Sequence, residues 1–348
     1  MNFRIGDVSV GSDQPCFIVA EMSGNHGGNF DRAIEIVRAA AESGANALKL
    51  QTYTADTITL NSDAPDFEIP SGPWESHQRM WDLYNVAHTP WDWHEPIYTE
   101  ARRLGLEVFS SPFDESAVDF LESLGTTAYK IASPEINHIP LLKRVAKTGK
   151  PVILSSGLAS LSDIELALST LRTNGAKDIA LLKCTTAYPA PFNEMDLLTI
   201  PDMAQRFELI SGLSDHSMGT AVAVAAAALG AKIIEKHFTL DVDEATVDSF
   251  FSNDRKEFAT LVADVRTVEQ ALGRISYDIS PSASVNLRGK RSLYISAPVI
   301  AGETLSSKNV RCVRPSFGLH PKHYDDIIGR VVKRDLSVGD RIQLEDLK

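Results

Sequence analysis

GLSDHSMG, residues 212–219, and IIEKHF, residues 233–238, are the stretches that decide the fold of this chain. Each belongs to an apolar run typical of a buried parallel strand, and each run ends near a histidine, His216 or His237. If the two strands are neighbours in one sheet, both imidazoles can converge above the strand ends. Two imidazoles without a thiolate leave coordination positions open, so the pair predicts a catalytic metal site suited to Mn, Fe, Co or Zn.

Similar apolar or β-branched runs recur along the chain and alternate with amphipathic segments, such as residues 31–44, that close on a glycine. The eight runs are FIVAEM (17–22), ALKLQTYT (47–54), EVFSSPF (107–113), AYKIAS (128–133), PVILSSG (151–157), IALLKCT (179–185), LISGLSDH (209–216) and IIEKHF. Eight alternations in about 250 residues predict a (β/α)8 TIM barrel with its chemistry at the C-terminal strand ends. A doubly wound open sheet is the alternative, but no GxGxxG follows the first run.

Composition changes sharply after the last predicted helix, which ends at Gly273. Residues 274–289 have linker composition, and residues 290–348 read as short strands and turns. We therefore predict a catalytic barrel at 1–273, a linker, and a small domain at 290–348. Within the small domain a faint repeat aligns Gly302 with Gly339, Leu305 with Ile342, and Asn309 with Asp346.

The 348 residues are 43% hydrophobic and 23% charged, which is typical of a globular protein, and the formal net charge is -12. This charge argues against nonspecific nucleic-acid binding. Cys16, Cys184 and Cys312 form no CxxC pair, so neither a disulfide framework nor a thiolate metal site is predicted. Without a recognisable signal peptide or membrane span, we expect a cytoplasmic protein.

The connection between the second and third runs is unusually long. Residues 55–93 contain all four tryptophans of the chain and the segment HTPWDWHEP. Long loops in compact domains are often lids or binding loops, and aromatic packing over the barrel rim is the alternative.

Alternation along each strand predicts which polar side chains face inward at the barrel mouth. The set is Glu21, Lys49, Gln51, Ser111, Lys130, Ser133, Ser155, Lys183, Thr185, Ser214, His216 and His237. Lysines with hydroxyls indicate a bound anion, and phosphate is the obvious candidate.

Several of these residues admit more than one role. Lys130 could form a Schiff base, as in an aldolase, although a metal and a Schiff base are usually alternatives. Glu21 is the best candidate acid or base, or else a salt-bridge partner, and Glu135 is a second carboxylate at the same rim. Asp215 can orient His216 or cap the following helix.

The motifs in order resemble those of the nonulosonic (sialic) acid synthase family over nearly the whole chain. They are AEMSGNH (20–26), KLQTYT (49–54), HTPWDWH (88–94), YKIAS (129–133), GLSDHSMG, and EKHFTL (235–240). The resemblance implies a (β/α)8 barrel followed by an antifreeze-like SAF domain. It also implies condensation of phosphoenolpyruvate with an acylated amino sugar in its open-chain aldehyde form.

The resemblance assigns roles to individual residues. His216 and His237 would hold a divalent ion, usually Mn²⁺, with Mg²⁺ or Co²⁺ as alternatives. Glu21, Glu135 and Lys130 would be catalytic, Glu21 by taking a proton from water. The implied phosphoenolpyruvate set is Lys49, Ser111, Lys130, Ser133, Ser155, Thr186 and Ser214. The implied sugar set is Gln51, Tyr188, Asp248 and Arg314. Family members are homodimers, in which the small domain's arginine reaches the partner's active site.

The chain departs from neuraminate synthases at several motif positions. Thr186 stands where those enzymes have Asn, Lys183 stands where they have His, and EMSGNHGG replaces EAGVNHNG. Ser316 stands where the family commonly has glycine near Arg314. These departures argue against neuraminate as the product. The wording of the motifs resembles that of family members that use 2,4-diacetamido-2,4,6-trideoxy-L-altrose, so the resemblance implies this acceptor, and synthesis of neuraminate or legionaminate is the alternative. A carbohydrate-binding protein without catalysis is a further alternative, against which the complete polar rim argues.

Overall fold

The computed structural model describes residues 1–348, which divide into two compact units, Met1–Gly273 and Arg274–Lys348. Each unit has its own hydrophobic core and is described by itself. No helix in either unit is both long enough and apolar enough to span a bilayer.

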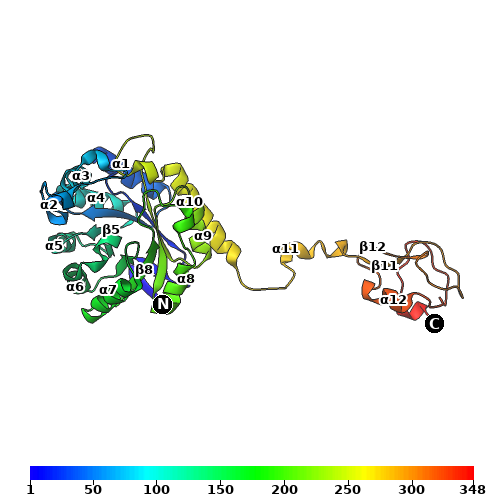
Figure 1. Ribbon diagram of the computed structural model, residues 1–348. Helices are drawn as coiled ribbons and strands as arrows, with labels where there is room; N and C mark the ends of the chain where they lie inside the picture. The colour runs from blue at the N-terminus through cyan, green and yellow to red at the C-terminus, as the bar shows by residue number, and fades with distance from the viewer. The chain divides into compact units, whose positions relative to one another are not determined.

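The first unit is a closed barrel of eight parallel strands surrounded by helices (Figure 1). The strands are β3 (Phe17–Glu21), β4 (Ala47–Thr52), β5 (Glu107–Pro112), β6 (Tyr129–Ile131), β7 (Val152–Ser155), β8 (Ile179–Cys184), β9 (Ile210–Asp215) and β10 (Ile233–His237). They follow one another around the barrel in chain order, and β10 pairs with β3 to close it. The predicted (β/α)8 fold is confirmed, and every predicted strand is present.

The helices follow the strands and cover the outside of the barrel. They are α1 (Phe30–Glu42), α4 (Trp91–Arg103), α5 (Glu115–Ser123), α6 (Ile139–Ala146), α7 (Leu161–Thr173), α8 (Thr199–Phe207), α9 (Ala221–Ala228) and α10 (Arg255–Leu272). Local sequence fixes many of their ends. Helix α10 begins at a capping box between Asp254 and Glu257 and stops at Gly273, whose positive φ of 48° suits a residue without a side chain.

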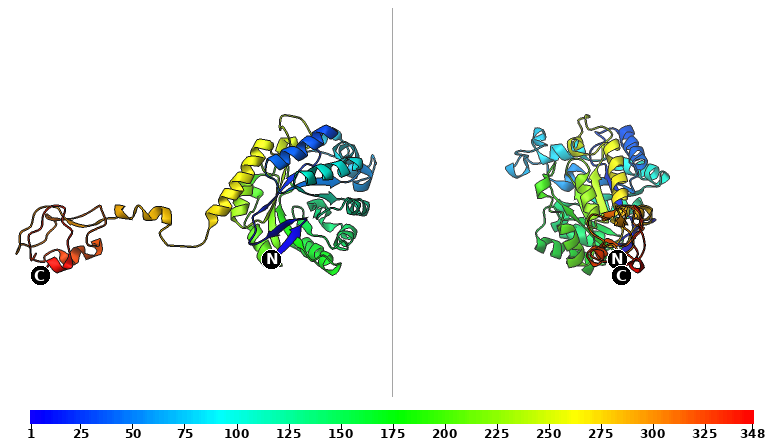
Figure 2. Two further views of the ribbon diagram at one scale, coloured as in Figure 1. Left: turned by 180° about the vertical axis from the view of Figure 1, so that it is seen from behind. Right: turned by 90° about the vertical axis from the view of Figure 1, so that its right-hand side faces the viewer.

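An N-terminal hairpin closes one end of the barrel. Strands β1 (Asn2–Ile5) and β2 (Val8–Gly11) pair antiparallel, and Phe3, Ile5 and Val10 join the barrel's interior cluster. That cluster also contains the first residues of several strands, Phe17 and Ile233 among them, so the hairpin covers their N-terminal ends (Figure 2). Chemistry is thereby confined to the C-terminal ends, as in other barrels of this kind.

The long connection after β4 holds two short helices, α2 (Ala55–Ile58) and α3 (Met80–Ala87), with two 3₁₀ turns between them. Its aromatic residues make specific contacts. Trp81 donates to Asp56, and Trp91, at the start of α4, donates to the Tyr53 carbonyl. Trp91 also stacks on Phe120 with ring centroids 4.7 Å apart. These three contacts are packing, whereas Trp74 and α3 reach the site described below.

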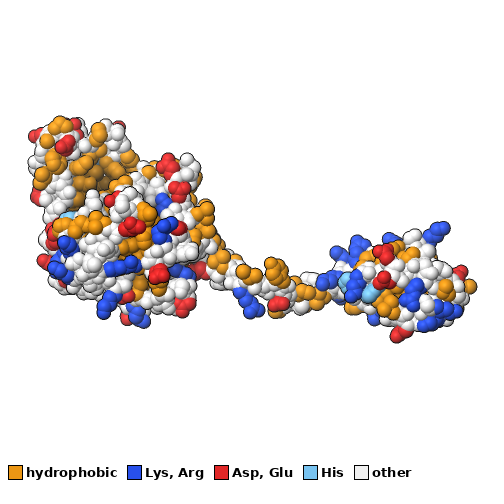
Figure 3. Space-filling view, turned by 60° about the horizontal axis from the view of Figure 1, so that its bottom comes forward, with side chains coloured by type: hydrophobic (Ala, Val, Ile, Leu, Met, Phe, Trp, Pro, Cys, Tyr) orange, Lys and Arg blue, Asp and Glu red, His pale blue; other side chains and the backbone are white.

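The second unit is small and built mainly of turns. Strands β11 (Ser292–Ile295) and β12 (Val310–Val313) pair antiparallel, and the short helices are α11 (Pro281–Ser284) and α12 (Tyr324–Ile327). From residue 290 onward the unit carries 11 Lys and Arg against seven Asp and Glu, although the whole chain is acidic. Figure 3 shows these basic side chains spread over the unit.

The faint repeat in this unit has a structural counterpart. Gly302 and Gly339 have nearly the same positive φ, 94° and 93°. Leu305 and Ile342 are both completely buried. The Asn309 side chain accepts from the Ser306 amide, and Asp346 accepts from the amide of Gln343, also three residues earlier. Each half therefore consists of a glycine turn, a core residue and a side chain that caps a turn.

Candidate active site

The C-terminal strand ends surround a small polar pocket of about 60 Å³ inside the barrel mouth. Predicted residues that line it are Lys49, Gln51, Ser111, Lys130, Ser133, Ser155, Tyr188, Ser214, His216 and His237, and Glu235 and Cys184 complete the polar lining. All the barrel strands except β3 contribute, so the pocket depends on closure of the whole barrel. The Ser155 hydroxyl is buried without a hydrogen-bond partner, which marks a position for a bound ligand.

Lys49, Lys130 and Glu235 line this pocket and form a buried cluster with Glu21, which lies behind Lys49 and lines neither cavity. Lys49 Nζ lies 2.8 Å from Glu21 Oε2 and 3.5 Å from Glu235 Oε1, while Lys130 Nζ lies 3.9 Å from Glu235. Although burial acts to lower the pKa of Lys49, the two carboxylates raise it. Burial raises the pKa of Glu21 against the opposing charge of Lys49. Lys49 therefore stays protonated, and Glu21 is disposed to accept a proton.

Glu235 is a residue that the sequence analysis missed. It has the same strand parity as His237 and therefore faces inward, where it holds both lysines and accepts a hydrogen bond from Ser214 (3.3 Å). The alternation rule that selected His237 also selects Glu235, so the signal was present in IIEKHF.

The two histidines lie together as the sequence predicts, with ring centroids 5.4 Å apart. His216 Nδ1 lies 3.0 Å from the Thr185 carbonyl and so donates to it, which leaves the Nε2 lone pair free. His237 Nδ1 is buried without a hydrogen-bond partner and lies 3.7 Å from Asp248. Nowhere does the structure bring three or more His, Cys, Asp or Glu side chains into a metal-binding group, so these two imidazoles are the candidate ligands.

Asp215 takes neither of its two predicted roles. Lys236 Nζ donates to it at 2.8 Å, and the Ser217 amide donates to it at 2.9 Å. Both charges of this ion pair are fully buried. The pair stabilises the turn after β9 and so fixes the backbone that presents His216.

The prediction that Lys183 and Thr185 face inward is wrong. On β8 the interior residues are Ala180 and Leu182, so Cys184 is the next side chain that points into the barrel. Lys183 instead donates to the Cys184 carbonyl (3.1 Å). The prediction chose the two more polar residues, Lys183 and Thr185. The residue of β8 that lines the pocket is Cys184, and the side chains of Lys183 and Thr185 point away from the pocket.

A second cavity of about 260 Å³ adjoins the first, and both are lined by Gln51, Pro134, Tyr188 and His237. Asp248 and Thr186 also line this outer cavity. Thr186, predicted with the phosphoenolpyruvate set, therefore lies with the sugar set. Gln51 donates to Glu21 and to Ser23 (both 2.9 Å), and Ser23 in turn donates to Asp248. These hydrogen bonds link the two cavities.

The long connection supplies one wall of the outer cavity through Trp74, Leu83, Tyr84 and Ala87. The binding-loop interpretation of this segment is thus supported for Trp74 and α3. Tyr84 was not singled out from the sequence, because a tyrosine on a short helix carries no distinctive pattern.

Glu135 lies just after Ser133, in the 3₁₀ turn that follows β6. One of its carboxylate oxygens is buried without a hydrogen-bond partner. Burial raises the pKa of Glu135 to about 7, and the charge of Lys130 only partly opposes this rise. Near neutral pH this carboxyl group can hold and release a proton.

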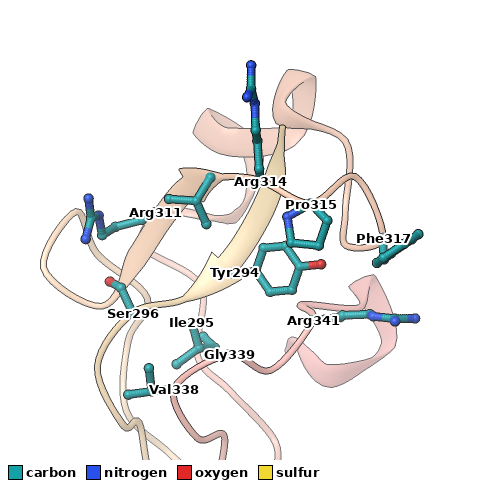
Figure 4. Close-up of a pocket in the computed structure, with 11 residues that line it drawn as sticks. Tyr294, Ile295, Ser296, Arg311, Arg314, Pro315, Phe317, Val338, Gly339 and Arg341 are labelled. Atoms are coloured by element: carbon teal, nitrogen blue, oxygen red, sulfur yellow. The ribbon is translucent and has the colours of Figure 1, made fainter. Parts of the chain in front are cut away.

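Arg314 belongs to the second unit, where it is exposed and forms no hydrogen bond or ion pair. It lines a separate open pocket of about 510 Å³ with Arg311 and Arg341, and Figure 4 shows its side chain extending away from theirs. Ser316 holds the neighbouring loop, since its hydroxyl donates to the Leu287 carbonyl at 2.9 Å. The loop that carries Arg314 is therefore anchored while the guanidinium stays free.

Comparison with known proteins agrees with this geometry. Residues 36–277 match the NeuB family, and residues 290–348 match the SAF domain. The chain belongs to the NeuB family. The family resemblance drawn from the motifs is confirmed, and the chain is an enzyme of this family that acts on small-molecule substrates.

Two relatives and one solved structure show which proteins this chain is similar to. The pseudaminic acid synthase of Campylobacter jejuni (strain 81-176) is 41% identical over 97% of this chain and 98% of the relative. The N,N'-diacetyllegionaminic acid synthase of C. jejuni (strain ATCC 700819) is 34% identical over 94% and 98%. A crystal structure of N-acetylneuraminic acid synthetase from Leptospira borgpetersenii, in complex with citrate, has a TM-score of 0.73 and 30% identity, and the match covers 82% of this chain and 95% of that one.

The position of Glu235 leads to a prediction. Burial lowers the pKa of Lys130 and the charge of Glu235 opposes this fall. Glu235→Gln removes that charge and so favours a neutral Lys130 that no longer attracts an anion, and the KM for an anionic substrate in the inner pocket should rise at least roughly tenfold. The measurements are steady-state kinetics and the midpoint of thermal unfolding. The control variant is Asp202→Asn, which breaks an exposed ion pair with Arg206 on α8. An unchanged KM would show that Glu235 does not sustain the charge of Lys130.

Proposed function

We propose that this enzyme condenses phosphoenolpyruvate with 2,4-diacetamido-2,4,6-trideoxy-L-altrose to give pseudaminic acid and phosphate. The observation that carries the proposal is 41% identity with a pseudaminic acid synthase over nearly the full length of both chains, against 34% for the legionaminic acid synthase. The site supports the same chemistry, because a lysine-rich inner pocket opens past two histidines into a larger cavity.

Phosphoenolpyruvate would occupy the inner pocket. Lys49 and Lys130 supply positive charge for its phosphate and carboxylate, and hydroxyls supply oriented donors. The unpartnered Ser155 hydroxyl and the Ser214 hydroxyl face this space. These groups are in place before binding, so they position the anion without a large rearrangement.

His216 and His237 would hold a divalent ion, for which we propose Mn²⁺, with Mg²⁺ or Co²⁺ as alternatives. The donor set fits, because one imidazole has a free Nε2 and the other has a buried Nδ1 without a partner. When bound, the ion supplies Lewis acidity to the aldehyde of the sugar.

The remaining steps use residues of the chain. The methylene carbon of phosphoenolpyruvate forms a bond to the aldehyde carbon, and positive charge develops at the carbon that bears phosphate. The aldehyde C=O π bond opens as this bond forms, and its oxygen takes up a proton. Water adds at the phosphate-bearing carbon while Glu21 takes one of its protons, which replaces the proton taken up by the aldehyde oxygen. Glu135 gives a proton to the phosphate oxygen as the C–O bond breaks, and it recovers a proton from the hydroxyl group that becomes the ketone. Lys49 and Lys130 stabilise the phosphate throughout.

An aldolase that forms a Schiff base is the less favoured alternative. Burial lowers the pKa of Lys130, as such a mechanism needs, but Glu235 opposes this fall from 3.9 Å and the Lys130 amine donates to the Ile131 carbonyl.

We further propose a cytoplasmic homodimer in which Arg314 of one chain reaches the active site of the other. Three observations support this arrangement. The Arg314 guanidinium is free, and the SAF region carries excess positive charge in an otherwise acidic chain. The three cysteines are unpaired, as is usual in a reducing compartment.

The acceptor and the metal can be tested in one assay. Phosphate release from phosphoenolpyruvate with Mn²⁺ should strongly favour 2,4-diacetamido-2,4,6-trideoxy-L-altrose over N-acetylmannosamine and the legionaminic acid precursor. A chelator should abolish this release, and added Mn²⁺ should restore it. Preference for another acceptor would reassign the product, and an adduct trapped by borohydride at Lys130 would instead indicate an aldolase.

The pKa of Glu135 predicts a pH dependence. A proton donor with a pKa of about 7 is charged above that pH, so kcat/KM should fall as the pH rises through 7. Glu135→Gln cannot give a proton and should lose roughly 10²–10⁴-fold in rate together with this descending limb. Glu115→Gln, at an exposed carboxylate on α5, should keep both. If kcat/KM of Glu135→Gln still falls as the pH rises through 7, another group causes the fall.

Mixed dimers test the placement of Arg314. Arg314→Ala and His237→Ala should each be nearly inactive alone. A heterodimer purified with two tags should recover about half the wild-type activity, because its intact barrel meets the partner's intact arginine. No recovery in a purified heterodimer would show that the arginine does not act across the dimer.

A further inference from the structure

The outer cavity has two sides of different chemistry. Its polar side carries Ser23, Gln51 and Asp248, which are hydrogen-bonded to one another beside His237. The rest of the lining is mostly apolar, from Trp74, Leu83, Ala87, Val247 and Phe251. A cavity divided in this way recognises a molecule with a polar reacting end and an apolar far end.

Three tyrosines stand along the apolar side. Tyr53, Tyr84 and Tyr188 all line the cavity, and none of their hydroxyl groups has a hydrogen-bond partner in the structure. Burial raises the pKa of Tyr53 and of Tyr84, so both remain neutral and able to donate. Unpaired phenols beside an apolar wall suit amide groups that carry a methyl, since the phenol meets the amide and the wall meets the methyl.

Packing between three distant segments holds this wall in place. Trp74 Nε1 donates to the Val247 carbonyl at 2.8 Å, and its ring lies 5.1 Å from that of Tyr188. Gly24 separates α3 from the segment of Val247. A Cβ at Gly24 would lie 3.1 Å from the Ala87 carbonyl oxygen and 3.3 Å from Val247 Cγ2. The wall is therefore preformed, and a side chain at Gly24 would crowd both of these segments.

We infer that Leu83, Ala87 and Val247, with the Tyr84 phenol, form a subsite for the end of the acceptor sugar farthest from its aldehyde. This inference rests on the proposed function and adds the source of its selectivity. With phosphoenolpyruvate in the inner pocket and the aldehyde at the histidines, the sugar extends into the outer cavity. The acetamido group at C4 then meets the phenols, and the methyl at C6 meets the wall.

The wall selects between sugars because its apolar side chains cannot form hydrogen bonds. A C6 hydroxymethyl group would place a hydroxyl against Leu83 and Ala87 without a partner, and so would lose affinity. One such change in an apolar subsite gives discrimination of roughly 10–100-fold. The altrose substrate should therefore be preferred over its 6-hydroxy counterpart, 2,4-diacetamido-2,4-dideoxy-L-altrose, by this factor.

The test compares kcat/KM for these two sugars in four proteins. They are the wild type, Leu83→Asn, Ala87→Ser, and the control Val86→Ser, which changes an exposed residue on the same helix. We expect Leu83→Asn and Ala87→Ser to reduce the preference at least about fivefold with the KM for phosphoenolpyruvate unchanged, and Val86→Ser to keep the preference. Because Leu83 is buried, the half-buried Ala87 provides the variant that is safer for folding.

The outcomes separate this inference from the proposed function. Active variants that keep the full preference would overturn the subsite while leaving the reaction in place. If the wild type converted neither sugar, the proposed function would fail, and saturation-transfer NMR of the bound altrose would then decide the subsite. Strong transfer to the C6 methyl in the wild type, lost in Ala87→Ser, would uphold it. Equal transfer in both proteins, or none, would overturn it.

Discussion

The buried charges of Lys49, Lys130, Glu21 and Glu235 are the constraint on which the site depends. Each charge would be very costly to bury alone, so each is tolerated only because the others are close. The four residues come from β3, β4, β6 and β10, and closure of the barrel between β10 and β3 brings them together. The charge pairing therefore depends on barrel closure. With no substrate bound the cluster holds two lysines ready for an anion, and an incoming phosphate competes with carboxylates that are already in place.

Most of the fold and much of the inner pocket could be predicted because both follow from strict periodicity. A strand buried on both faces reads as a continuous apolar run, and alternation then selects the inward residues at its end. This logic found the eight strands, both histidines, and Lys49 and Lys130. It failed where residues were selected because they are polar and not by their alternation along the strand. Lys183 and Thr185 looked functional, but the parity of Leu182 selects Cys184, and Glu235 was overlooked beside the more conspicuous His237.

Other features could not be predicted from local patterns. The N-terminal hairpin consists of two four-residue strands. Its Phe3, Ile5 and Val10 fill the end of the barrel, and this long-range contact cannot be predicted from such short strands. The wall of the outer cavity joins residues 74–87, which include Trp74 and α3, to the segment of Val247, which lies far away in sequence. Only the packed structure shows that a side chain at Gly24 would crowd Ala87 and Val247 there.

The two cavities are built from different structural elements, and this difference matches the part of the substrate that each would bind. The inner pocket stands on barrel strands whose ladders fix each side chain, which suits chemistry on the phosphoenolpyruvate common to the reaction. The outer cavity is built from loops and a short helix, where sequence can change without disturbing the barrel. In the proposed reaction, a different acceptor sugar requires a different wall, whereas the lysines and histidines of the inner pocket act on the part of the reaction that does not change. Substitutions in α3 can therefore alter the acceptor while Glu235, Lys49 and Lys130 stay in place, since the loss of one of those buried charges would leave its partner unpaired.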